Sequence, residues 1–372
     1  MNICQLLLSR NRSIYISGGV DIDNAGGGLR GNRAELTKEL TELLSDEYGF
    51  DKSAKYIDLE GSSSLNLCVE SNQTRYVVRV YRPYITANRL DDIIHIRKKL
   101  NENGIPYSKT FQNIKNQNYI KWNDRLVEVE YFVENDGVMD TLEKLQSALP
   151  LFGKMTSVLG DIENISANGE NPYFANQIHF EQITKMTEKG CARILSWNPT
   201  DSERKIIYMS KKLEEKVAQA GEKIFSYLPQ QLAHGDFWDN NVLFSENKIA
   251  LIVDLDFLGK RRRIEDIALT LYFSHISENF CKSTTLSTKR AVELKQLLNL
   301  YESGLSTRLI EIERIALPIA IVLQVFWGIG GWVVLLDDEN TARNHASGMM
   351  WELERCNYIM DNLSEWQDIF SE

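Results

Sequence analysis

The chain contains 372 residues, a length typical of two structural domains. Hydrophobic residues make up 43% of it and charged residues 25%, which is ordinary for a globular protein and excludes the disordered and fibrous classes. Acidic residues outnumber basic residues by 52 to 42, giving a formal net charge of −10. We expect no nucleic-acid partner, because binding to phosphates along a strand requires a clustered basic surface.

The cysteines and the N-terminus are typical of a protein of the reducing cytoplasm. The segment 3–8 is apolar, but it is short and no basic residue precedes it, unlike the start of a signal peptide. The cysteines form no CxxC pair and predict neither a disulfide framework nor a zinc site. They are odd in number and far apart in the sequence: Cys4, Cys68, Cys191, Cys281 and Cys356. We therefore expect a cytoplasmic location.

One segment, 315–336, carries no charged residue and is long enough to cross a bilayer. It also contains Pro318, Gln324 and three glycines, and no second segment of this kind accompanies it. A helix that is apolar on all sides is equally typical of the centre of a large helical domain. We favour the core helix over the membrane span and expect no membrane partner.

The first part of the chain predicts a glycine-rich extension followed by a β-rich region. Residues 1–33 contain several glycines, but no P-loop Gly-Lys-Ser/Thr follows them, so they predict an extension and not a phosphate site. Beyond them, valine- and tyrosine-rich runs bounded by turn residues predict strands, and apolar residues at helical spacing predict helices. The expected elements are a helix over 34–48, strands over 56–60, 65–70 and 76–81, a helix over 89–103, and a hairpin over 119–122 and 125–133.

Helical patterns dominate after Gly137, apart from a strand pair around residues 232–257. The sequence therefore predicts an α+β fold with a smaller β-rich N-lobe over residues 34–134 and a larger, mainly helical C-lobe over residues 135–372. Ligands commonly bind where two such lobes meet. The expected long helices cover 141–159, 200–220, 265–278, 290–304, 310–336 and 342–363.

The most informative segment is 232–257, LAHGDFWDNNVLFSENKIALIVDLDF. Asp236 precedes Asn241 by five residues, and Asp254 follows thirteen residues later, at the end of an apolar run. Transfer of a phosphoryl group requires a carboxylate that orients the attacking hydroxyl and accepts its proton, and oxygen ligands, typically from Asn and Asp, that hold magnesium. His-Gly-Asp-x-x-x-x-Asn followed by a strand-terminal Asp supplies these groups in chain order.

This segment resembles the aminoglycoside phosphotransferase and choline kinase superfamily, which includes homoserine-kinase-like small-molecule kinases and has a bilobal, protein-kinase-like fold. The resemblance implies Asp236 as the catalytic base, Asn241 and Asp254 as magnesium ligands, and ATP as the phosphate donor. Downstream, Arg-Ile-Glu-Asp-Ile-Ala resembles the family segment whose Asp hydrogen-bonds to the catalytic loop; an Asp that only satisfies the first turn of a helix is equally plausible there. Three residues are expected to support the site without transferring protons: His234, Asp256 and Asp266.

The expected N-lobe offers three groups to the nucleotide. The family's phosphate-binding lysine is replaced by Arg79, whose guanidinium can bind a phosphate through two N–H groups and always keeps its charge. Its acidic partner is left open between Asp91 and Asp92 of the following helix. The backbone of Glu130 and Phe132 resembles the hinge that holds adenine. The loop between the first two strands carries backbone amides and hydroxyls suited to the phosphates, at Gly61, Ser62, Ser63 and Ser64.

The acceptor pocket is expected in the C-lobe, close to Asp236. Aromatic and acidic side chains together suit a cationic amine, whereas burial in the helical core is the competing interpretation for the tryptophans. We expect an ATP- and magnesium-dependent kinase that phosphorylates a hydroxyl of an amine-bearing small molecule, such as an aminoglycoside-like antibiotic, an amino alcohol, homoserine or an amino sugar. The candidates to line the pocket are Trp238, Asp239, Trp327 and Trp332.

Two alternatives come from other functional classes. A protein kinase needs an activation segment that binds a substrate peptide, and only eleven residues separate Asp254 from Asp266. A nucleotide-binding protein without kinase activity would be expected to lack Asp236, Asn241 or Asp254, and the chain carries all three. Magnesium-dependent thermal stabilisation by ATP without phosphate transfer would favour this second alternative.

Overall fold

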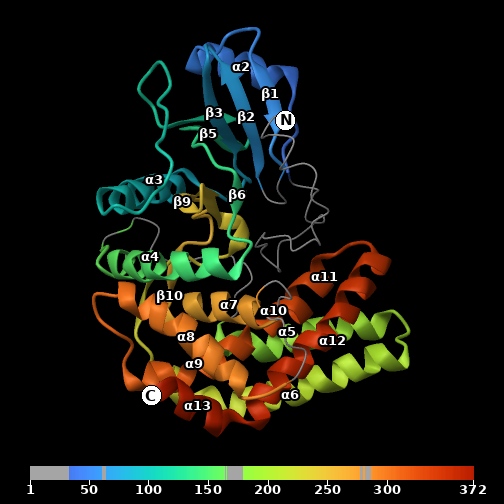
Figure 1. The fold of residues 1–372 in the computed structure, drawn as a ribbon. Helices are drawn as coiled ribbons and strands as arrows, with labels where there is room; N and C mark the ends of the chain where they lie inside the picture. The colour runs from blue at the N-terminus through green and yellow to red at the C-terminus, as the bar shows by residue number, and fades with distance from the viewer. Residues whose placement is uncertain (1–32, 61–63, 164, 166–178, 277–279, 281–285) are drawn as a thin grey trace.

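The computed structural model describes residues 33–60, 64–163, 165, 179–276, 280 and 286–372. The N-lobe, at the top of Figure 1, consists of a sheet with helices, and the C-lobe below it is mainly helical. The extension expected over residues 1–33 lies outside the described residues, except for Arg33.

The N-lobe is built on a five-stranded sheet with the order β1-β2-β3-β5-β4, in which every neighbouring pair is antiparallel. The strands are β1 (Lys55–Asp58), β2 (Leu65–Ser71), β3 (Thr74–Val80), β4 (Tyr119–Trp122) and β5 (Arg125–Tyr131). Helix α2 (Lys38–Tyr48) precedes the sheet and α3 (Ala87–Glu102) follows β3. The predicted strands and helices of this lobe lie within four residues of these bounds.

Side chains alternate between the two faces of this sheet, and the alternation determines where the polar groups lie. One set of positions packs with Leu40 and Leu44 of α2 in an apolar cluster that includes Val78, Val80, Val127 and Val129. The intervening positions carry charged residues that are buried or half-buried: Arg79 of β3, and Glu128 and Glu130 of β5. The sheet therefore has one apolar face against α2 and one charged face.

The C-lobe contains most of the helices and two small sheets. β6 (Gly137–Val138), β8 (Val242–Ser245) and β9 (Lys248–Ile252) form one sheet in the order β6-β8-β9, and β7 (Gln230–Ala233) pairs with β10 (Gly259–Arg262) in the other. Short 3-10 turns cover Phe180–Gln182 and Asp239–Asn241. The main helices are α4 (Leu142–Gly160), α5 (Ile183–Ser196), α6 (Asp201–Phe225), α7 (Arg263–Ile276), α8 (Lys289–Gly304), α9 (Glu311–Leu323), α12 (Glu339–Asp361) and α13 (Leu363–Ser371).

The apolar segment predicted as one helix over 310–336 is interrupted in the structure. It comprises α9, the short α10 (Val325–Trp327), a π-helical turn (Gly328–Trp332) and α11 (Val333–Leu335). A Cβ atom at Gly330 would lie 2.4 Å from the carbonyl oxygen of Met186, so α5 can approach this turn closely only because glycine stands there. The most apolar stretch of Glu311–Leu335 is 94% buried inside the protein, which agrees with the core-helix interpretation.

Glu352 of α12 makes the stability of the C-lobe depend on pH. Its carboxylate is buried and accepts a hydrogen bond from the hydroxyl of Tyr272. Burial raises the pKa of Glu352 from 4.5 to about 7, so the native protein retains a proton that the unfolded chain has released. The free energy of unfolding should therefore fall as pH rises between these two values and be level above them. Glu352→Gln should remove a decline of about 2 kcal/mol, measured by urea unfolding at about pH 5 and about pH 7.5.

Glu354→Gln provides the matched control, because Glu354 lies on the same helix with its side chain 46% exposed. The control should keep the pH dependence of the wild-type protein. A decline of equal size in Glu352→Gln and Glu354→Gln would show that Glu352 is not the titrating group.

Candidate active site

The predicted catalytic loop, residues 234–241, lies between β7 and β8 and is bound by the first turn of α7. Gly235 has a φ of +87°, and a Cβ atom there would lie 2.3 Å from the carbonyl oxygen of Phe257, so the loop requires glycine at this position. Asp266 in the first turn of α7 accepts hydrogen bonds of 2.7 Å from the backbone N–H groups of His234 and of Gly235. The side chain of Asp266 thus joins the loop directly to the start of a core helix.

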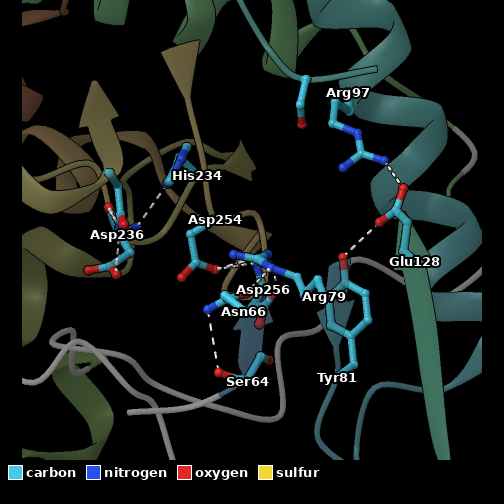
Figure 2. Close-up of polar contacts among 12 residues, drawn as sticks. Ser64, Asn66, Arg79, Tyr81, Arg97, Glu128, His234, Asp236, Asp254 and Asp256 are labelled. Atoms are coloured by element: carbon cyan, nitrogen blue, oxygen red, sulfur yellow. Dashed lines mark hydrogen bonds and ion pairs between the residues drawn. The ribbon is translucent and has the colours of Figure 1, made fainter. Parts of the chain in front are cut away.

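The carboxylate of Asp236 is completely buried and is oriented by Asn241. The amide nitrogen of Asn241 donates to the backbone carbonyl of Asp236 at 2.8 Å and to its Oδ2 at 2.9 Å. The backbone N–H of Asp236 donates to Nδ1 of His234 at 3.2 Å (Figure 2). Burial lowers the pKa of His234. A neutral ring that accepts through Nδ1 holds the loop, which leaves Asp236 as the group suited to proton transfer.

Asp254 follows β9 in a left-handed backbone conformation, with a φ of +68°, which Asp tolerates better than most residues. The N–H of Val253 donates to the carbonyl of Asn241 at 2.9 Å, so the loop of Asp254 is tied to the loop of Asp236. Since the nitrogen of the Asn241 amide is occupied, its oxygen is the atom left to bind a metal.

The side-chain oxygens of Asn241 and Asp254 fit magnesium, which takes one or two protein carboxylates or amides and completes its shell with phosphates and water. Across the part of the chain that the structure describes, no group of three or more His, Cys, Asp or Glu side chains forms a complete metal site.

Arg79 joins the charged face of the N-lobe sheet to the C-lobe (Figure 2). Its Nη1 lies 3.2 Å from Oδ1 of Asp256 and 3.9 Å from Oδ1 of Asp254, and its Nε donates to Oδ1 of Asn66 at 3.2 Å. Burial and the neighbouring Asp254 raise the pKa of Asp256 to about 7. Arg89 of α3 donates to the backbone carbonyl of Asp256 at 3.0 Å. The acidic partners of Arg79 therefore come from the segment after β9, which answers the question left open between Asp91 and Asp92.

The loop expected over the phosphates is described only in part. Gly61, Ser62 and Ser63 lie outside the described residues. Ser64 is 4% exposed, and its Oγ has no hydrogen-bond partner in the described structure. Its carbonyl accepts a hydrogen bond from Asn66, the residue that also contacts Arg79.

At the expected hinge, the two predicted residues use their polar groups within the N-lobe. The backbone of Glu130 is paired with Val77 of β3 and with Thr110, and its carboxylate accepts hydrogen bonds from Arg97 and Ser108. The N–H of Phe132 donates to the carbonyl of Arg75 at 3.2 Å. An adenine ring could bind to this N–H only after it exchanged that partner, so the structure does not present Phe132 as a ready donor.

The acceptor candidates divide into two pairs. Trp238, two residues after Asp236, is stacked on Phe273 with ring centroids 4.8 Å apart, and Asp239 is half-buried beside it in the chain. Trp327 and Trp332 pack edge to face at 6.3 Å within the interrupted helix, with Trp327 only 2% exposed. Trp238, Trp327 and Trp332 all belong to the main apolar cluster, and Trp238 is only 9% exposed, so the core interpretation suits all three. Trp238 and Asp239 remain candidates because of their position next to Asp236 in the catalytic loop.

The sequence interpretation did not include a buried polar chain that runs from α3 to Arg79. Tyr81 donates to Glu128, and Glu128 is paired with Arg97 of α3 (Figure 2). The signal available in the sequence was the alternation in β5, where Glu128 stands between two valines and Glu130 between Val129 and Tyr131, at positions that a buried strand usually fills with apolar residues.

Comparison with solved structures agrees with the fold described above. A microcompartment-associated aminopropanol kinase superposes with a TM-score of 0.64 at 12% identity, over 88% of this chain and 98% of its own. Amicoumacin kinase in complex with AMP-PNP, Ca²⁺ and Ami gives 0.61 at 12% identity, over 86% and 94%. Choline kinase from Cryptosporidium parvum gives 0.55 at 16% identity, over 88% and 97%. These similarities confirm the predicted bilobal, protein-kinase-like fold.

A search of curated protein sequences finds no match to the chain. The sequence model of the phosphotransferase enzyme family matches residues 57–287, which is more than half of the chain and includes the loops of Asp236 and Asp254. The chain therefore belongs to the phosphotransferase enzyme family and is a kinase whose acceptor is a hydroxyl group of a small molecule.

Proposed function

We propose that this kinase transfers the γ-phosphate of ATP, in a magnesium-dependent reaction, to a hydroxyl of an amine-bearing small molecule. The observation that carries the proposal is the contact between Asn241 and Asp236. A single side chain, Asn241, orients the carboxylate suited to be the base through its nitrogen and keeps an oxygen for the metal. This contact brings proton acceptor and metal ligand together, as in-line phosphoryl transfer requires.

Each residue has one task in this proposal. Asp236 orients the acceptor hydroxyl and takes its proton as the oxygen attacks the γ-phosphorus and the bond to the ADP oxygen breaks. Asn241 and Asp254 hold magnesium, which neutralises charge on the phosphates when it is bound. Arg79 provides a permanent positive charge toward the phosphates. ATP is supported by the amicoumacin kinase, whose structure holds AMP-PNP.

The preference for an amine rests on the residues beside the catalytic loop and on the similar kinases. Trp238 offers an aromatic ring and Asp239 a carboxylate two and three residues after the base, a pair suited to an ammonium group. Two of the similar structures are kinases named for amine-bearing alcohols, aminopropanol and choline. We place the reaction in the cytoplasm, where ATP and free thiols are both maintained.

The protein-kinase alternative is disfavoured by the course of the chain after Asp254. A turn, strand β10 and the start of α7 occupy the eleven residues before Asp266. Because β10 is paired with β7 inside the C-lobe, this segment provides no platform for a substrate peptide.

The test is a screen for ADP release from ATP and magnesium against aminoglycosides, homoserine, choline, amino alcohols and amino sugars, and against other hydroxylated antibiotics and alcohols that lack an amine. We expect acceptor-dependent ADP release for at least one amine-bearing alcohol, with Asp236→Asn as the blank. Turnover only with hydroxyl compounds that lack an amine would overturn the acceptor assignment. Binding of ATP with magnesium but no transfer to any acceptor would favour the alternative of a nucleotide-binding protein without kinase activity.

A further inference from the structure

Arg79 lies in β3 directly across from an acidic residue to which it does not bind. The antiparallel register of β3 and β5 places Arg79 opposite Glu128. Directly opposed residues have Cβ atoms about 5 Å apart, so an arginine and a glutamate there would normally pair with each other. The guanidinium of Arg79 extends instead to Asp256 and Asn66 at the junction of the lobes. The buried carboxylate of Glu128 must therefore find its hydrogen-bond and charge partners elsewhere.

We propose that Tyr81 and Arg97 satisfy Glu128 and thereby leave the guanidinium of Arg79 at the junction of the lobes, where the nucleotide would bind, which makes Tyr81 a positioning residue of the active site. This inference rests on the proposed function, because it takes the phosphates of ATP as the ligand of Arg79. Helix α3 would then act on Arg79 indirectly, through Glu128 of β5 and the hydroxyl of Tyr81.

Tyr81 is placed to act on both Glu128 and Arg79. It is completely buried, and its hydroxyl donates to Oε2 of Glu128 at 2.9 Å. The guanidinium carbon of Arg79 lies 5.5 Å from the centre of the tyrosine ring, within the range of a cation–π contact. The backbone N–H of Tyr81 donates to the carbonyl of Leu126 at 2.9 Å, which fixes the residue at the end of the β3–β5 pairing.

Glu128 is held on its other side by α3. Its carboxylate is completely buried, pairs with the guanidinium of Arg97 and accepts a hydrogen bond from Thr110 at 2.8 Å. Arg97 also pairs with Glu130 and donates to Thr110 at 2.7 Å, so the helix and the strand are joined by several charge-assisted bonds. With these partners in place, Glu128 has no need of Arg79.

Removing one of these partners should let Glu128 compete for Arg79. Tyr81→Phe keeps the ring and removes only the hydroxyl, so the dissociation constant of the magnesium–ATP complex should rise about tenfold, measured by isothermal titration calorimetry. Tyr48→Phe is the matched control. Tyr48 is also buried in the N-lobe, but it packs in the apolar cluster on the α2 side of the sheet, and its hydroxyl donates to the backbone carbonyl of Val127 at 3.4 Å. The control should leave the dissociation constant unchanged.

A double-mutant cycle separates positioning from general destabilisation. In the Arg79→Met background, Tyr81→Phe should no longer change the dissociation constant, because the residue through which it acts has gone. Adding Glu128→Gln to Tyr81→Phe should restore tight binding, since a neutral amide competes poorly for arginine. An equal rise in both backgrounds, an unchanged constant in Tyr81→Phe, or a further loss in the Glu128→Gln double variant would each overturn the proposal. No binding of magnesium–ATP to the wild-type protein would instead overturn the proposed function on which it rests.

Discussion

Asp236→Asn should lower kcat by about a thousandfold or more while the affinity for magnesium–ATP stays within about twofold. The asparagine keeps the size of the side chain and still offers an oxygen to Nδ2 of Asn241, so the loop should retain its shape. What it loses is the ability to take the proton of the acceptor hydroxyl. Steady-state kinetics with an acceptor from the screen, together with calorimetric titration of the nucleotide, measure the two quantities separately.

Asp161→Asn serves as the control for this substitution, because Asp161 is an exposed residue at the end of α4. It should have wild-type kinetics. If Asp236→Asn retains turnover, Asp236 is not the base. If it loses nucleotide binding as well as turnover, the carboxylate acts on the fold or the nucleotide and not on the acceptor proton.

Local patterns were sufficient for most of the fold. The N-lobe strands alternate strongly, and α6 begins with a capping box in which Thr200 and Glu203 satisfy each other's backbone groups. Helix α5 was not predicted, although its apolar residues recur at helical spacing. It contains threonines and Gly190 and has no side-chain hydrogen bond at its N-terminus, so the start signal is missing. The interruption at Gly328–Trp332 depends on the approach of α5, which no local pattern contains.

The candidate site likewise contains residues that a local pattern could identify and contacts that it could not. Asp236, Asn241, Asp254 and Asp266 lie within about thirty residues of one another, and a spaced motif with a chemical purpose could identify them together. The partners of Arg79 could not be identified locally, because Asp256 is 177 residues away along the chain. Charge pairing in a folded protein depends on which faces meet, and spacing along a sequence does not contain that information.

Asp266→Ala should be the most destabilising single substitution at the site. It would leave the backbone N–H groups of His234 and Gly235 without their acceptor inside the protein, at a cost of about 1–3 kcal/mol each. We therefore expect the free energy of unfolding to fall by about 2–6 kcal/mol in urea denaturation. Asp266→Asn should lose less, because its amide can accept one of the two hydrogen bonds while its NH₂ group faces the other donor.

Asp338→Asn provides the comparison, because Asp338 also accepts a backbone N–H, that of Thr341 at 2.7 Å, but does so at the exposed start of α12. Asparagine caps helices as well as aspartate does, so this variant should change stability by less than about 0.5 kcal/mol. The folded fraction of Asp266→Asn should also lose kcat, since Asp236 follows directly after Gly235. If Asp266→Ala were no less stable than Asp338→Asn, the carboxylate would not be what joins α7 to the catalytic loop. A fall in both stability and turnover would show that the buried carboxylate of Asp266 supports the fold and also the position of Asp236.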